Sequence, residues 1–405
     1  MKIAIIGGGG KISRAVIWKL LSDVRDVPLC FALFGRNKEK IADTLTLSER
    51  FNSGNGELLC CEALDEALEG ADIVFYCATY GTDDFEGLRS MGITNGAHIL
   101  RIGEKISKIC PNAWFLVATN PPCVPLMALR MRSGFKKSIA LCNAGMFGKK
   151  VLSSFLNCDE SRLTMHEFGV NHEFWYYDVL LDGKDIYGDL RRRLPEEYDR
   201  NKIKGEFHEE FPEWSYGFKN TVEILRLTGF LSAPVGGSKR YLNLPVSDMW
   251  SIASRPTAED FKNMLDGDKT DDQILKTAMR CGGGIPLYSA ELLKSLIYSD
   301  GREHSVIAFN DGAAPMYPDE SMLQMSCRVE ANALTAPDLS GVDPYIHAVL
   351  ASRIHQNHLI AQALAYQDDL KLRQALSVYP ERIDICKTDN FLENYSSVEP
   401  FIQLN

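Results

Sequence analysis

A glycine-rich turn near the start of the chain constrains the fold more than any other feature of the sequence. A β-branched run over residues 2–6 leads into Gly7, Gly8, Gly9, Gly10 and Lys11, and an amphipathic segment over residues 14–24 follows. A strand, a glycine turn and a helix in this order let backbone N–H groups approach a pyrophosphate, which lies on the positive end of the helix. The turn therefore predicts a dinucleotide-binding unit, although Ile12 or Ser13, depending on the register, occupies the place of the third glycine.

The end of the second predicted strand bears on which dinucleotide is bound. Residues 29–34 are predicted as this strand, and Gly35 and Arg36 follow it. A fold that binds NAD usually has an acidic residue here, which accepts hydrogen bonds from the adenosine ribose, whereas an arginine can pair with the 2′-phosphate of NADP. The acid is missing and Arg36 stands beside the gap, so both NAD and NADP are open.

Two further buried strands, over residues 71–78 and 114–118, extend the predicted parallel sheet. Thr79 follows the first strand, and Thr119-Asn120-Pro121 follows the second. Ligands of open α/β sheets bind outside the carboxyl ends of the strands. Strands that end in Thr-Asn-Pro recur in the lactate and malate dehydrogenase superfamily, where the Asn lies near nicotinamide and substrate. We therefore expect Thr79 and Asn120 to lie at the cofactor site.

A cysteine and a histidine each stand where a predicted strand runs out. Residues 138–141 lead to Cys142 and Asn143, and residues 162–170 lead to Asn171 and His172. A thiolate and an imidazole that converge could hold one metal ion, and they suit Mn, Fe, Co, Ni or Zn better than Mg. Taken singly, a buried cysteine is more often part of a core and an Asn-His pair more often a hydrogen-bonded corner. Their joint position in this fold favours a metal site.

The rest of the chain is predicted as a mixed α+β region. We expect helices over 189–230, with residues 207–216 irregular, and over 258–281, 289–298 and 344–376. We also expect a strand and hairpin turn over 179–185 and strands over 306–310 and 322–329. The fold class is thus α/β, with a Rossmann-like parallel sheet and a C-terminal α+β domain. We place a dinucleotide-binding domain at 1–160 and a substrate- and metal-binding domain at 161–405.

Composition limits the partners of the chain. A net charge of −10 without a basic face argues against nucleic acid. The sequence lacks a run of the ~20 apolar residues that a membrane span needs, and its N-terminal apolar run is too short for a signal peptide. The eleven cysteines are scattered without framework spacing, which is typical of a reducing cytoplasm. We expect a cytoplasmic protein.

In order along the chain, the motifs resemble those of glycoside hydrolase family 4. The resemblance rests on the glycine loop, Thr119-Asn120-Pro121, Cys142-Asn143, Gly169-Val170-Asn171-His172 and Asn310-Asp311-Gly312-Ala313. It implies a lactate/malate dehydrogenase-like fold and a glycosidase that depends on NAD and a divalent metal, mostly manganese. In the implied reaction, the cofactor takes hydride from C3 of the sugar, a base removes the C2 proton, and the glycosidic oxygen leaves. Water then adds and the hydride returns, while the metal chelated by O2 and O3 stabilises negative charge.

The resemblance also implies roles for individual residues. Cys142 and His172 match the metal ligands, and Asn143 and Asn171 would contact sugar hydroxyls, with Asn143 beside the reacting centre. The family is mostly dimeric or tetrameric, which implies a homodimer or homotetramer acting on a small-molecule glycoside.

The catalytic base is implied less directly. Tyr288 is the nearest match to the tyrosine that removes the C2 proton, and Arg280 is the cation that could lower its pKa and contact the substrate. A shift of the alignment by one residue places Leu287 there instead.

The segment over residues 79–95 departs from family members that act on sugar 6-phosphates. Those members have an arginine-containing segment here, whereas Tyr80–Glu86 is acidic and Arg89 is the one cation nearby. This composition argues against a 6-phosphosugar.

Two other functions share part of the pattern. A 2-hydroxyacid dehydrogenase would use the glycine turn and Asn120, but it needs a proton-shuttling histidine and an arginine clamp. His172 stands in an Asn-His pair, and an arginine loop after residue 78 is absent. A non-catalytic dinucleotide sensor fits the missing ribose acid, but not the presence of Cys142 and His172.

Overall fold

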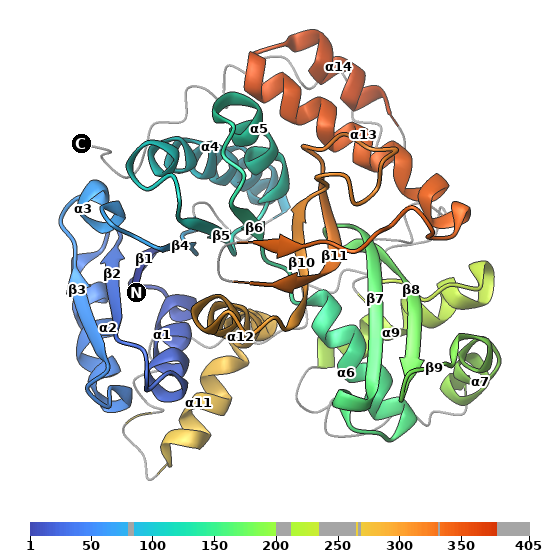
Figure 1. The fold of residues 1–405 in the computed structure, drawn as a ribbon, viewed down its shortest axis with the longest axis horizontal. Helices are drawn as coiled ribbons and strands as arrows, with labels where there is room; N and C mark the ends of the chain where they lie inside the picture. Colours follow the sequence, from blue (N-terminus) through green and yellow to red (C-terminus); the bar gives the residue numbers. More distant parts are fainter. Residues whose placement is uncertain (80–84, 200–211, 235–264, 266–268, 331–332, 379–405) are drawn as a thin grey trace.

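The computed structural model describes residues 1–79, 85–199, 212–234, 265, 269–330 and 333–378. Within these residues, twelve strands form one sheet in the order β3-β2-β1-β4-β5-β6-β10-β11-β7-β8-β9, with β12 paired to β11 (Figure 1). The strands are β1 (Lys2–Ile6), β2 (Leu29–Phe34), β3 (Gly56–Cys60), β4 (Ile73–Tyr76), β5 (Trp114–Val117), β6 (Ser138–Ala140), β7 (Leu163–Val170), β8 (Glu173–Leu181), β9 (Lys184–Asp185), β10 (Glu303–Phe309), β11 (Met322–Val329) and β12 (Leu334–Thr335).

Helices cover both faces of this sheet. They are α1 (Lys11–Asp23), α2 (Lys38–Ser48), α3 (Leu64–Leu68), α4 (Phe85–Ile109), α5 (Cys123–Ser133), α6 (Ala144–Leu156), α7 (Tyr187–Asp199), α9 (Pro212–Thr228), α11 (Asp271–Met279), α12 (Ile285–Tyr298), α13 (Pro344–Tyr366) and α14 (Asp369–Ser377), with 3-10 turns η1 (Glu49–Phe51), η2 (Glu160–Arg162) and η5 (Cys281–Gly284). None of the described helices is long and apolar enough to cross a membrane.

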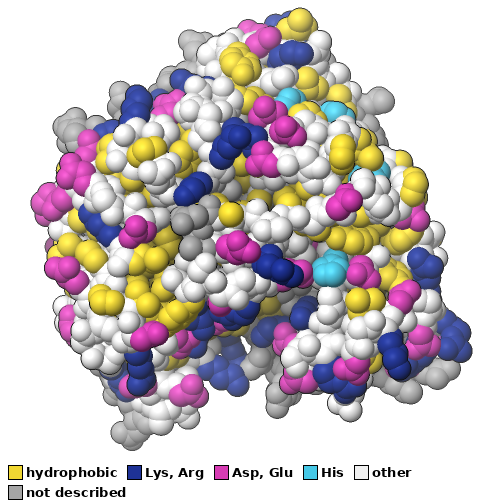
Figure 2. Space-filling model, viewed as in Figure 1, with side chains coloured by type: hydrophobic (Ala, Val, Ile, Leu, Met, Phe, Trp, Pro, Cys, Tyr) yellow, Lys and Arg dark blue, Asp and Glu magenta, His cyan; other side chains and the backbone are white. Residues whose placement is uncertain are grey.

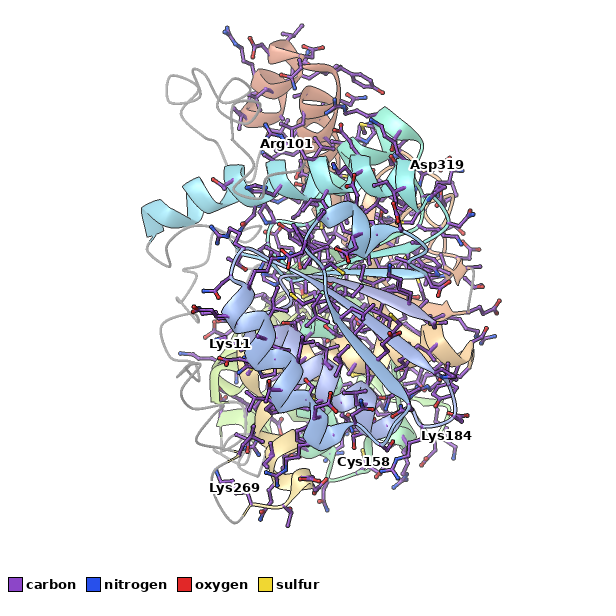
Figure 3. All side chains as sticks on the ribbon, turned by 90° about the vertical axis from the view of Figure 1, so that its left-hand side faces the viewer. Lys11, Arg101, Cys158, Lys184, Lys269 and Asp319 are labelled. Carbon is purple, nitrogen blue, oxygen red and sulfur yellow. The ribbon has the colours of Figure 1, made fainter. Side chains whose placement is uncertain are left out.

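The first six strands are parallel and have the order 3-2-1-4-5-6 of dinucleotide-binding folds. This arrangement confirms the predicted α/β class with a Rossmann-like sheet. Side chains alternate across the sheet: Ile3 and Ile5 pack into the core on the side of α1 and α12, whereas Ala4 and Ile6 pack on the side of α4 and α5. Figures 1 and 3 show the two helical layers on opposite sides.

The sheet continues from the parallel half into an antiparallel half. Strand β10 pairs with β6 through Ile307 and Ala140, and β11, β7, β8 and β9 follow. The sheet thus runs across the predicted boundary between residues 160 and 161, and the division into two domains stays a prediction.

Several predicted bounds need correction. Strand β3 was not predicted; its residues alternate between half-buried and exposed, as expected at the edge of the sheet. Strand β8 begins at Glu173 rather than at residue 179, and residues 85–95, for which no helix was predicted, form the start of α4. Residues 212–216, predicted to be irregular, belong to α9, and residues 207–211 lie outside the described residues. The helices predicted over 344–376 are α13 and α14. Of the helix predicted over 258–281, residues 258–264 and 266–268 lie outside the described residues.

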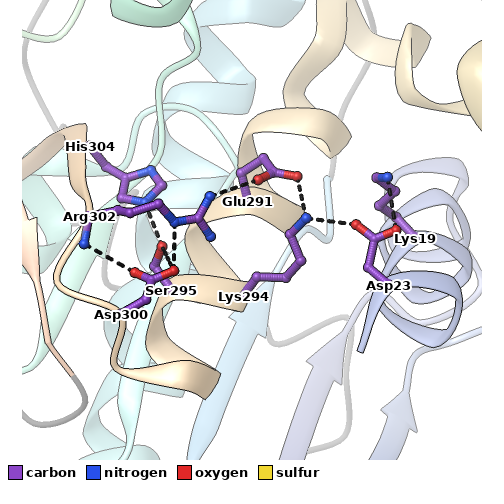
Figure 4. Close-up of polar contacts among 8 residues, drawn as sticks. All are labelled: Lys19, Asp23, Glu291, Lys294, Ser295, Asp300, Arg302 and His304. Carbon is purple, nitrogen blue, oxygen red and sulfur yellow. Dashed lines mark hydrogen bonds and ion pairs between the residues drawn. The ribbon is translucent and has the colours of Figure 1, made fainter. Parts of the chain in front are cut away.

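A series of ion pairs joins α12 to α1. Asp23 on α1 contacts Lys294 on α12 at 2.7 Å, and Lys294 also contacts Glu291 at 2.6 Å (Figure 4). These side chains are largely shielded from solvent, since Lys294 is 16% and Asp23 is 21% exposed. Helix α12 is thereby fixed against the dinucleotide-binding half. Over the rest of the face shown in Figure 2, acidic and basic side chains are interspersed.

Candidate functional site

The glycine turn packs so closely that side chains would not fit. A Cβ added to Gly7, whose φ is 101°, would lie 2.8 Å from the backbone nitrogen of Ala78. A Cβ added to Gly8 would lie 2.7 Å from the Cβ of Leu33. A Cβ added to Gly9 would lie 2.8 Å from the Cβ of Lys40. The turn is therefore pressed between the carboxyl ends of β1, β2 and β4, where the strand order reverses and a dinucleotide binds.

Helix α1 presents its positive end at this turn. Gly10 is the N-cap residue and supplies no side-chain acceptor to the N–H groups of the first helical turn. Such groups and the helix dipole favour phosphate. Lys11 is the first residue of α1, and Figure 3 shows it at the outer end of this helix.

Two arginines lie around the same edge of the sheet. Burial and, to a smaller extent, the charges of Arg101 and Arg36 together lower the pKa of His98 on α4 to about 4. Arg36 follows β2, as predicted, whereas Arg101 was missed by the sequence analysis. Its position on the helix α4 became apparent only from the structure.

The ends of β4 and β5 are held side by side. The Thr119 hydroxyl donates to the carbonyl of Ala78 at 2.8 Å, and the Asn95 amide donates to the carbonyl of Asn120 at 3.0 Å. Thr79 and Asn120 are both exposed. Because Ala78 also touches Gly7, both residues lie at the edge that carries the glycine turn.

The register of four strands brings Cys142 and His172 together. Ala140, Ile307, Gln324 and Gly169 form one row across β6, β10, β11 and β7. Cys142 comes two residues after Ala140 in this row, and His172 comes three residues after Gly169. The backbone N–H groups of Ala144 and His172 lie close enough to the Cys142 sulfur to lower the pKa of the thiol.

Burial dominates the protonation of this thiol. Cys142 is 3% exposed, and burial raises its pKa to about 12, while the two N–H donors lower it. The residue directly precedes Asn143, the N-cap of α6. A helix N-terminus favours a thiolate, and a bound cation would favour it far more strongly.

The turn that carries His172 is tight and strained. His172 has a φ of 66°, in the left-handed region that few side chains adopt. A Cβ on Gly169 would lie 2.3 Å from the carbonyl oxygen of Glu173, so the hairpin needs a glycine there. The Asn171 side-chain oxygen is buried and has no hydrogen-bond partner. Strain and an unsatisfied acceptor together are typical of a functional site.

A contact that was not predicted joins the site to η5. The Asn143 side-chain amide donates to the backbone carbonyl of Gly283. Arg280 is the residue directly before η5 and is exposed. Asn143 is therefore next to the short segment that follows Arg280.

The electrostatic expectation for Tyr288 is wrong. Burial raises the pKa of Tyr288 well above its ordinary value, and the charges of Cys142, Glu167 and Cys327 raise it further. Its hydroxyl donates to the backbone carbonyl of Ser305, and the side chain is 3% exposed. Tyr288 lies on the buried face of α12. The sequence placed this residue at the head of a helix but could not show which face of the helix is buried.

Glu167 is a further buried group that the sequence analysis missed. It is 2% exposed, and burial raises the pKa of its carboxyl to about 7, while hydrogen bonds from Ser305 and Gln324 lower it. It acts electrostatically on Cys142. In the sequence, Glu167 stands between His166 and Phe168 in a strand, and this position does not indicate that it lies near Cys142.

The chemistry of Cys142 and His172 fits two ligands of a metal ion whose remaining ligands are substrate oxygens. Among the described residues, no group of three or more His, Cys, Asp and Glu side chains could hold a metal. Cys142 and His172 supply a soft sulfur and a borderline nitrogen, suited to a divalent transition metal. Two protein ligands leave room for the two sugar oxygens that the family resemblance implies.

A parallel sheet of this strand order, a glycine turn at its switch point and a Cys/His pair beside it define a dinucleotide-dependent enzyme with the lactate/malate dehydrogenase architecture. Comparison with known protein families gives the particular family. Residues 76–158 match the "Family 4 glycosyl hydrolase" model, and residues 167–381 match the "Family 4 glycosyl hydrolase C-terminal domain" model. The chain belongs to glycoside hydrolase family 4 and is an NAD- and divalent-metal-dependent glycosidase.

Individual proteins agree with this assignment. A probable 6-phospho-beta-glucosidase of Bacillus subtilis (strain 168) is 25% identical over 321 residues, 76% of this chain and 68% of its own. A 6-phospho-alpha-glucosidase from gut microorganisms, solved with NAD and Mn²⁺, superposes with a TM-score of 0.72 at 16% identity, covering 98% of this chain and 97% of its own. A lactate dehydrogenase from Eimeria maxima has a TM-score of 0.57 at 16% identity, covering 92% and 98%. The predicted fold and family are thus confirmed.

Proposed function

We propose that Cys142 and His172 hold the divalent metal of this glycosidase and that residues 7–11 hold the phosphates of its nicotinamide cofactor. The observation that supports this most directly is the row that Ala140 and Gly169 share across four strands, two residues before Cys142 and three before His172. The backbone N–H of His172 also lies near enough to the Cys142 sulfur to lower the pKa of the thiol. Both observations support the proposal that the two predicted ligands converge although they belong to different strands. When bound, the metal and the cofactor supply Lewis acidity and hydride transfer.

The polypeptide positions the sugar in this proposal. The unsatisfied oxygen of Asn171 accepts a hydrogen bond from a sugar hydroxyl. Asn143, whose amide is held by Gly283, presents its own oxygen to the substrate from the start of α6. Both side chains adjoin a metal ligand in the sequence, so a sugar that they bind is placed against the Cys/His pair.

Proton removal from C2 is not assigned to Tyr288. A base must reach the proton that it removes, and the Tyr288 hydroxyl is buried against a backbone carbonyl with a raised pKa. Arg280 keeps a proposed role in substrate contact, since it is exposed and precedes the segment that binds Asn143.

We propose a substrate without a 6-phosphate. The acidic residues Asp83, Asp84 and Glu86 stand where a phosphate would need cations. The first two lie outside the described residues, and this point rests on sequence. A homodimer or homotetramer in the cytoplasm is proposed from the family and from the free thiols of the cysteines that the structure describes.

The test is a panel of aryl glycosides that carry neutral, 6-phospho, uronic or 6-sulfo sugars. Each is assayed with NAD or NADP, Mn²⁺ and a thiol reductant. We expect cleavage of a neutral or uronic glycoside with incorporation of solvent deuterium at C2 of the product. Cleavage without deuterium at C2 would refute the redox elimination, and a strict requirement for 6-phosphate would refute the proposed substrate class. Light scattering on the purified protein measures the oligomeric state.

A further inference from the structure

Helix α13 contacts the hairpin that carries His172 through a buried ion pair. Glu173 directly follows His172 and begins β8, and its carboxylate is bound by Arg353 from α13. The Arg353 Nε lies 3.0 Å from Glu173 Oε2, and Nη2 lies 3.2 Å from Oε1. The side chains are 11% and 6% exposed. This is a bidentate pair, which fixes orientation as well as distance, and burial protects it from screening by salt.

Arg353 is itself held in place by a chain of hydrogen bonds through Gln356. Its Nη1 donates to the Gln356 side-chain oxygen at 2.7 Å. The Gln356 amide in turn donates to the carbonyls of Ala375 and Val378, at 2.9 and 3.1 Å. The guanidinium is therefore attached to both α13 and the end of α14, and it presents a fixed fork to the hairpin.

The hairpin has reason to need such support. The left-handed backbone of His172 persists only where its surroundings impose it. The residue before it, Asn171, has an unsatisfied buried oxygen, whereas Glu173 after it is held at both carboxylate oxygens. A buried ion pair is seldom the most stabilising choice at a site, because apolar residues of similar size often stabilise as well or better. Orientation of the neighbouring residue is a function that apolar packing would supply less well.

We propose that Arg353 is a positioning residue, which acts through Glu173 to hold the His172 turn in the geometry that binds the metal. The inference rests on the proposed metal site and adds α13 to it. Groups that orient metal ligands typically change metal affinity by about 10- to 100-fold when they are removed.

The test compares Co²⁺ binding by full-length variants, because Co²⁺ bound to a thiolate absorbs in the near ultraviolet. The principal variant is E173Q/R353M, which removes both charges of the pair together. We expect its Co²⁺ affinity to fall about 10- to 100-fold with a changed spectrum. Arg353→Lys, which keeps the cation without the fork, should bind with intermediate affinity.

The matched control is D23N/K294M, which removes the ion pair between α1 and α12 at a distance of 2.7 Å and similar shielding. It should keep the wild-type Co²⁺ affinity and spectrum. The inference is overturned if E173Q/R353M binds Co²⁺ within twofold of the wild type, or if D23N/K294M loses as much affinity. Failure of the metal site itself is distinguishable, since Cys142→Ser would then also leave Co²⁺ binding unchanged.

Discussion

The sulfur of Cys142 lies near the backbone N–H of His172, a residue on the other side of two intervening strands. The contact depends on backbone register rather than on flexible side chains, because β6, β10, β11 and β7 share the row that precedes both residues. Ligands carried by strand ends and tight turns lose little freedom when they bind. The metal site that we propose for these two residues would thus be largely formed before any cation arrives.

Removal of the metal should abolish glycoside cleavage and leave dinucleotide binding intact. Dialysis against a chelator should remove activity, and Mn²⁺ should restore it. Cys142→Ser should reduce kcat/KM by about 100-fold or more, because a neutral hydroxyl is a poor ligand for a transition metal. Binding of the dinucleotide, followed by fluorescence, serves as the control, since residues 7–11 are unchanged. A Cys142→Ser enzyme with wild-type activity would show that the thiol is no ligand.

Gly7→Ala should damage the cofactor site. The new Cβ would lie 2.8 Å from the Ala78 nitrogen at a φ of 101°, so the turn must shift. We expect a loss of about 1–3 kcal/mol of unfolding free energy and at least a tenfold loss of dinucleotide affinity, measured by denaturation and by titration. Gly188→Ala is the matched control, because Gly188 is exposed near the start of α7 and its Cβ would meet nothing within 4 Å. Equal effects of the two substitutions would contradict the argument.

Because of His166, the free energy of unfolding should fall as the pH rises into the alkaline range. Glu303 and Asp178 bind its ring and raise its pKa to about 9, above the value of about 6.5 in the unfolded chain. The stabilisation is fully present below pH 6.5 and is lost as pH rises through 9. We expect a loss of about 1–2 kcal/mol, reduced by partial exposure, in denaturation curves between pH 6 and 9.5.

His166→Gln should flatten this pH dependence. His304→Gln should not, because burial lowers the pKa of His304 to about 4, so that His304 is neutral across the whole range. A wild-type curve without a slope between these pH values would show that the His166 interactions have no net effect.

The parallel half of the fold was predictable because its buried strands are apolar runs that alternate with helices. The edge strand β3 and the first half of β8 were not predicted, although Leu58–Cys61 and Phe174–Tyr177 are short apolar runs of the kind that buried strands contain. The start of α4 contains Gly87 and Gly92, which lower helix propensity and made a loop the simpler interpretation. The row from Ala140 to Gly169 could not be predicted, because it joins strands in an order that the sequence does not follow.

The residues of the candidate site likewise divide into those that the sequence could indicate and those that only the structure reveals. Cys142, Asn143, Asn171 and His172 could be proposed from the sequence because each follows a predictable strand, and their roles stay predictions. Arg101 and Glu167 lie within regular elements, so only the structure shows what they face. Tyr288 was misjudged for the same reason: sequence located it on a helix, but the packing of α12 decides that its hydroxyl is buried.

The position of Arg36 predicts that the enzyme accepts NADP. Arg36 is exposed after β2, where the adenosine ribose of a dinucleotide lies, and its charge adds to that of Arg101 around His98. A hydrogen bond to a charged group contributes about 1.5–3 kcal/mol, so Arg36→Gln should weaken NADP binding by about tenfold or more and change NAD binding by less than twofold. Calorimetric titration of both cofactors measures this difference.

Arg162→Gln provides a control, because Arg162 pairs with Asp182 at the remote end of the β7–β8 hairpin. A wild-type enzyme that binds NAD more than ten times as tightly as NADP would show instead that Arg36 does not meet a 2′-phosphate.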